Sequence, residues 1–133
     1  MNKKFIISVI VLFVISMLWG FGVHGWLLAD EYNALGGFFR PEQEEARYFP
    51  FMLLGHLAFA AGFVWIYLRG KEDKPYLGQG IRFGLAVAVL LTVSTYLIYY
   101  AVQPYPGVLV LRQISYDGIG NLVMGVAVAW INR

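Results

Sequence analysis

"FIISVIVLFVISMLWGFGVHGWLL", residues 5–28, is long, apolar and free of Asp, Glu, Lys and Arg. A helix of about 20 apolar residues crosses the roughly 30 Å hydrocarbon core of a bilayer. Three similar stretches follow, at about 49–68, 81–102 and 107–131. The chain is 59% hydrophobic and 14% charged, with a mean hydropathy of +0.64, which is more apolar surface than a small soluble fold can bury. We therefore predict a single all-α domain over residues 1–133, a polytopic integral membrane protein with four transmembrane helices in an up-down-up-down bundle.

The start of the chain, "MNKK", resembles the beginning of a signal peptide. The apolar run after it is long for a signal, and no convincing small-x-small cleavage site follows. We therefore expect residues 5–28 to be a retained helix.

The distribution of Lys and Arg predicts the orientation. One side of the four spans carries Lys3, Lys4, Arg69, Lys71, Lys74, Arg82 and Arg133. The other side carries Arg40 and Arg47. Because cytoplasmic segments hold the excess of Lys and Arg, we expect both termini in the cytoplasm and a multi-pass location in a bacterial inner membrane.

The segment 29–48 is then an outer acidic loop. Its carboxylates are Asp30, Glu31, Glu42, Glu44 and Glu45. Pro41 suits a first helical position, and acidic residues directly after it suit the first turn of a helix. We expect a helix that begins near Pro41, runs into the second span and bends at Pro50.

Small residues predict where the helices pack. They recur at four-residue intervals in the third span and also occur in the fourth; the candidates for packing are Gly80, Gly84, Ala88, Gly118 and Gly125. Small side chains let membrane helices approach each other closely.

The fourth span contains an unusual polar stretch, "RQISYDGIGN", residues 112–121. With histidines and a tyrosine of the other spans, it predicts a polar cluster in the outer half of the bundle: His24, His56, Tyr96, Arg112, Gln113, Tyr116, Asp117 and Asn121. At 1.5 Å per residue, Asp117 and His56 lie about 3 to 4 Å outward of the midplane, and His24 and Arg112 about 10 Å. The candidate partners of Asp117 are therefore His56 and the hydroxyls of the third span.

Two interpretations of this cluster remain open. It lines a pocket that is reached from the outer face and binds a small ligand or lipid, or it is an interhelical clasp without a ligand. Arg112 and Asp117 do not share a helix face, so Arg112 is expected to reach outward, to water, lipid phosphate or a carboxylate such as Asp30 or Glu31.

Short motifs resemble those of a known family. "YDGIGNLVMGVAVAWI" (116–131), "GIRFGL" (80–85) and "MLWGFG" (17–22) are similar to a family of small bacterial four-helix membrane proteins classed as a domain of unknown function. The resemblance implies four helices and no particular activity. The acidic loop and His24 lie outside it.

The functional prediction follows from what the sequence lacks. It has no cysteine, nucleotide-binding loop, metal-ligand cluster or nucleophile–base set. We therefore expect a non-catalytic accessory or structural subunit of a larger membrane complex, with no nucleic-acid partner. Its partners are then the lipid bilayer and other membrane subunits or further copies of the chain.

Two alternatives stay open. The first is a haem b protein that uses His24 and His56 as ligands, since two histidines on different helices are the minimum for bis-imidazole ligation. The second is a small proton-coupled transporter that acts as a dimer, with Asp117 as the coupling carboxylate.

Overall fold

The computed structural model describes residues 3–133, and within that range the chain forms helices and no strand. Four helical stretches are long and apolar enough to cross a membrane: Lys3–Leu27, Glu42–Gly70, Tyr76–Val102 and Gly107–Ile131. The predictions of an all-helical fold and of four candidate spans are confirmed. The second span begins at Glu42 and not at 49, and the third at Tyr76 and not at 81, because these helices continue past their apolar parts. The other predicted boundaries agree within two residues.

Two of the spans contain a π-helical segment. The first consists of α1 (Lys3–Gly22) and η1 (Val23–Leu27), and the third of α4 (Tyr76–Val87), η2 (Ala88–Val93) and α5 (Ser94–Val102). The other two spans are α3 (Glu42–Gly70) and α6 (Gly107–Ile131). The wider π turn changes the direction in which later side chains point, and such segments are frequent at functional sites.

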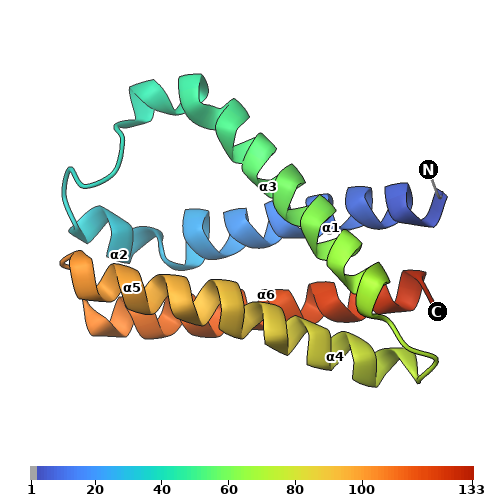
Figure 1. Ribbon diagram of the computed structural model, residues 1–133. Coiled ribbons are helices and arrows are strands. Elements are labelled where there is room, and N and C mark those ends of the chain that lie inside the picture. The colour runs from blue at the N-terminus through green and yellow to red at the C-terminus, as the bar shows by residue number, and fades with distance from the viewer. Residues whose placement is uncertain (1–2) are drawn as a thin grey trace.

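Three parts of the chain meet at one end of the molecule. Lys4 Nζ donates to the carbonyl of Arg133 at 3.3 Å, and Lys71 Nζ donates to the carbonyl of Asn132 at 2.9 Å. The start of α1, the loop between α3 and α4 and the end of α6 therefore lie together, on the right in Figure 1. We call this the basic end, and the opposite end, with residues 29–48, the acidic end.

The acidic segment 29–48 is more helical than a loop. It contains α2 (Ala29–Ala34) and the first turns of α3. Between them, Gly36 and Gly37 adopt positive φ angles of 48° and 67°, which a glycine reaches without steric cost. Pro41 precedes α3 as its extended N-cap residue (ψ 151°), so the prediction that it is the first helical residue is wrong by one position.

The tightest helix contact joins α4 and α6. A Cβ on Gly84 would lie 2.5 Å from the carbonyl oxygen of Asn121, and one on Gly80 would lie 2.6 Å from that of Gly125. The backbones therefore touch at these glycines, and Ala88 is buried at the start of η2. Gly118 does not belong to this contact, contrary to the prediction, because a Cβ there would meet nothing within 4 Å.

Two apolar cores hold the bundle. The larger lies toward the basic end, around Leu12, Val64, Tyr67, Met124 and Val128. The smaller lies toward the acidic end and consists of Val23, Leu28 and Leu109, with Trp19, Tyr32, Leu35, Tyr105 and Tyr116 packed around them. The polar cluster described next lies beside this smaller core.

Candidate functional site

Side chains from three helical segments meet at Asp117. His24 comes from η1, Tyr96 from α5 and Asp117 from α6. His24 Nε2 lies 3.1 Å and 3.2 Å from the two Asp117 oxygens, and the Tyr96 hydroxyl donates to Oδ2 at 2.6 Å. Both neighbours can donate, so the Asp117 oxygens act as hydrogen-bond acceptors in this contact.

A second pair of residues extends this contact toward the acidic end. Gln113 Nε2 donates to the Tyr32 oxygen at 3.0 Å, and that oxygen lies 2.6 Å from His24 Nδ1. Burial raises the pKa of Tyr32, and the Asp117 carboxylate adds to that rise, so the phenol stays protonated at neutral pH. Tyr32 then donates its hydrogen to His24 Nδ1, and His24 donates from Nε2 to Asp117.

The result is a continuous chain of hydrogen bonds. It runs from Gln113 through Tyr32 and His24 to Asp117, where Tyr96 joins it. One polar atom of this hydrogen-bonded network lacks a partner: the Oε1 of Gln113 is buried and has no hydrogen-bond partner within residues 3–133. Such an atom costs free energy unless a water, a ligand or a rearranged donor satisfies it.

Arg112 lies outside this chain. It forms an ion pair with Glu31, in which the Arg112 side chain is half exposed. Glu31 is one of the two carboxylates that the sequence suggested for it. The pair joins α2 to α6 without entering the part-buried network around Asp117.

Asn121 and Tyr116 lie apart from the Asp117 network. Asn121 is buried and donates to the Thr92 hydroxyl at 2.7 Å, which ties α6 to η2. Tyr116 contributes its carbonyl, which accepts from the Trp19 indole at 3.0 Å, while its ring packs on the smaller core. The prediction that the Tyr116 side chain joins the polar cluster is wrong, because that ring points to the apolar side of α6.

His56 does not contact Asp117. Its Nδ1 lies 3.0 Å from the Ser16 hydroxyl, and Ser16 donates to the carbonyl of Phe13 at 2.9 Å. Since the Ser16 hydrogen is used on that carbonyl, its oxygen accepts from His56. The proposed Asp117–His56 pairing is therefore wrong: similar depth in the membrane did not place the two residues on facing sides of their helices.

The haem alternative loses its geometric basis. Both ring nitrogens of His24 are engaged, one with Tyr32 and one with Asp117, so neither nitrogen is free to bind iron in this arrangement. Within residues 3–133, no group of three or more His, Cys, Asp or Glu side chains could hold a metal ion.

Sequence reasoning missed Tyr32 and Ser16. Tyr32 follows His24 by eight residues, a spacing of about two helical turns, but the sequence places it in the predicted acidic loop. Ser16 lies in an apolar helix, where a single hydroxyl carries little signal. Recognising α2 as a helix would have placed Tyr32 on the side of His24.

The chain matches no family model, no curated protein and no solved structure. Arguments about function therefore rest on the chemistry and geometry of these residues.

Proposed function

We propose that this chain is a non-catalytic accessory or structural subunit of a larger complex in the bacterial inner membrane, with both termini in the cytoplasm. In this proposal the helices form an up-down-up-down bundle, and the polar network acts as an internal clasp. Asp117 supports the clasp because side chains of the same chain donate to its carboxylate.

The observation that carries the proposal is the packing of α3. Its second half contributes Ala60, Phe63, Val64 and Tyr67 to the larger core, whereas its first half has no buried residue. Figure 1 shows this half leaving the other helices as α3 crosses α1. Its apolar side chains, such as Phe51 and Leu54, are 68% and 62% exposed.

An apolar helix face that leaves its own bundle suits a contact with another membrane subunit. Gly55 and Ala58 lie among the exposed apolar residues of this half, and a Cβ on Gly55 would meet nothing within 4 Å. Small residues on an open face permit close approach of a second helix. Lipid also covers apolar faces, so the experiment must distinguish a contact with lipid from a contact with another membrane subunit.

A photo-activated crosslinker at Leu54 makes that separation. We expect Leu54→p-benzoylphenylalanine, irradiated in native membranes, to give an adduct of one discrete protein mass. Leu90, 68% exposed on η2, is the matched control and should give lipid adducts alone. An adduct of twice the chain mass would identify the partner as a second copy. Lipid adducts alone at both positions would contradict the proposal.

A second candidate is proton-coupled transport, which the hydrogen-bond chain favours. Each of its links can reverse when one proton enters from the Gln113 end: the Gln113 amide turns, Tyr32 donates to Oε1, His24 donates from Nδ1 to Tyr32, and Asp117, now protonated, donates to His24 Nε2. A chain with two directions is what a proton relay needs. Proteoliposomes with an internal pH dye would test it: Asp117→Asn should abolish a flux that the unchanged protein supports.

A further inference from the structure

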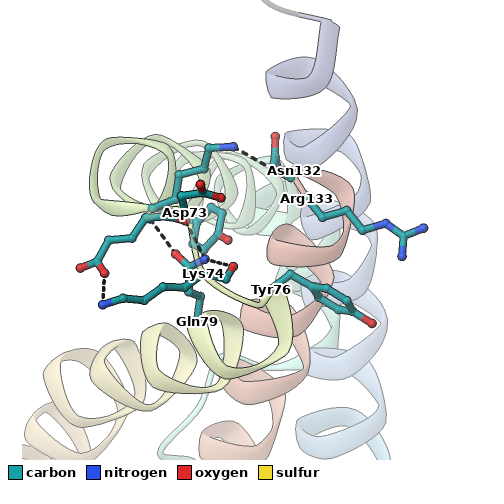
Figure 2. Close-up of a pocket in the computed structure, with 9 residues that line it drawn as sticks. Asp73, Lys74, Tyr76, Gln79, Asn132 and Arg133 are labelled. Carbon is teal, nitrogen blue, oxygen red and sulfur yellow. Dashed lines mark hydrogen bonds and ion pairs between the residues drawn. The ribbon is translucent and has the colours of Figure 1, made fainter.

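A cavity of about 320 Å³ opens at the basic end, far from the His24–Asp117 network. It lies among the end of α3, the loop after it, the start of α4 and the end of α6. Figure 2 shows Asp73, Gln79 and Asn132 around it and the Arg133 side chain directed away from it. A second cavity of about 310 Å³ shares Tyr67, Lys71, Glu72 and Gln79 and adds Arg82. Sites for small molecules begin at roughly this volume.

The walls of the cavity are held by hydrogen bonds. Gln79 Nε2 donates to the carbonyls of Glu72 and Lys74 at 2.8 Å and 2.7 Å, and its Oε1 accepts from the Glu72 N–H at 2.7 Å. Asn132 Nδ2 donates to the Ser8 hydroxyl at 2.9 Å and to the Val128 carbonyl at 2.8 Å. The loop and the end of α6 are therefore fixed before any ligand arrives.

Hydrogen-bonding capacity remains inside these walls. Lys71 uses one ammonium hydrogen on Asn132, which leaves two. Tyr67 is 4% exposed and lines the cavity, and its hydroxyl has no hydrogen bond within residues 3–133, so it is available as a donor. Both groups are donors suited to an anion.

The two acidic residues of the cavity, Glu72 and Asp73, differ in whether a nearby cation neutralises them. Glu72 and Lys74 form an ion pair, and the Lys74 hydrogen bond lowers the pKa of Glu72, so these two charges offset each other. Asp73 lines the cavity and has no ion pair among the described residues. The cavity thus presents the cationic Lys71 together with one free carboxylate.

The cavity lies at the level of an aromatic and cationic rim. Trp65 and Trp130 are each 53% exposed near this end, with the guanidinium groups of Arg69 and Arg133 stacked on their rings at 4.9 Å and 5.3 Å. Exposed tryptophans with nearby basic residues are typical of the membrane–water interface. Lipid headgroups occupy that level.

We propose that this cavity binds a phosphoryl group that carries a neighbouring ammonium group, as in the headgroup of phosphatidylethanolamine. Lys71 and Tyr67 hold the phosphate oxygens, and Asp73 holds the ammonium. A headgroup with a phosphate and no amine would leave Asp73 facing an anion, which disfavours it. The lipid is the preferred source because the cavity opens at the interface; soluble phosphoethanolamine has the same chemistry.

Native mass spectrometry of the full chain in an uncharged detergent tests this proposal. The probes are phosphatidylethanolamine, phosphatidylglycerol and soluble phosphoethanolamine. We expect phosphatidylethanolamine to bind about fivefold more tightly than phosphatidylglycerol, and Lys71→Gln and Tyr67→Phe each to weaken it about tenfold. Asp73→Asn should remove the preference between the two lipids.

The matched control is Arg69→Gln, which removes a charge at the same end but not from the cavity. It should leave lipid binding unchanged within about twofold. Competition by soluble phosphoethanolamine at lipid-like concentrations would support the site and assign a soluble source. Three results would each overturn the proposal. They are equal binding of the two lipids, equal weakening by Arg69→Gln and Lys71→Gln, and the absence of any lipid adduct. Tyr67→Phe keeps the buried ring and so reports binding without loss of the core.

Discussion

At the scale of single residues, Asp117 shows how a costly polar group is accommodated among apolar helices. Its carboxylate receives hydrogen bonds from His24 and Tyr96, which come from two other spans. A buried polar group is tolerated when its partners lie in place, and it becomes a liability when one of them is removed. The stability of the clasp should therefore depend on what replaces Asp117.

We predict a graded loss of folding stability for substitutions at Asp117. Asp117→Asn keeps an oxygen that accepts from Tyr96. If the Gln113 amide turns and the network reverses, the new amide also donates to His24. The loss of folding stability should therefore be smallest for this substitution. Asp117→Leu leaves two donors unpaired, at about 1 to 3 kcal/mol each. Asp117→Lys adds a cation beside His24 and should destabilise the protein most.

Reversible unfolding in mixed micelles, followed by circular dichroism, measures these free energies. Ser115→Leu is the control and should be close to neutral, because Ser115 lies exposed on the same helix and donates to the Leu111 carbonyl of its own helix. Equal losses for Asp117→Asn and Asp117→Leu would show that only the negative charge matters and that the network cannot reverse.

At the scale of helices, the contact between α4 and α6 has almost no tolerance for added atoms. The backbones approach at Gly80, Gly84 and Gly125, where each added Cβ would lie within 2.6 Å of a backbone oxygen. Backbone atoms cannot rotate away as a side chain can, so the helices themselves must separate. Such overpacking typically costs about 1 to 3 kcal/mol.

Gly84→Ala should therefore destabilise the protein by about 2 kcal/mol or more. Gly62→Ala is the matched control, since a Cβ on that α3 glycine meets nothing within 4 Å and alanine favours helix. It should be neutral or slightly stabilising in the same unfolding assay. Equal effects of the two substitutions would mean that helix propensity, and not the α4–α6 contact, sets the loss.

The same contact shows what the sequence could predict. Gly80 and Gly84 recur at a spacing that marks one helix face, and α4 packs against α6 through that face.

The partner of Asp117 was harder to predict. Membrane depths estimated for straight helices separate His24 from Asp117 by about 7 Å. The π-helical η1 and the crossing of the helices instead bring His24 Nε2 to 3.1 Å from Asp117 Oδ2. Side-chain partners depend on helix rotation and crossing, which one sequence does not encode locally.

At the scale of the whole molecule, charge is distributed unequally between the two ends. Carboxylates of α2 and the start of α3 gather at the acidic end, and lysines and arginines gather where the termini and the α3–α4 loop meet. The proposed orientation, with the basic end in the cytoplasm, follows from this asymmetry. It also places the cavity of Lys71 and Tyr67 on the cytoplasmic face and the His24–Asp117 network nearer the outer face.

The orientation is testable because the chain contains no cysteine, so a single introduced cysteine reports one position. Glu45→Cys marks the acidic end and Asp73→Cys the basic end; both residues are exposed, and neither change removes a Lys or Arg that directs insertion. A membrane-impermeant maleimide should label Glu45→Cys in intact spheroplasts and Asp73→Cys only after lysis. The reverse pattern would invert the proposed orientation, and labelling of both in intact spheroplasts would contradict a membrane-spanning α3, the helix that separates these two positions.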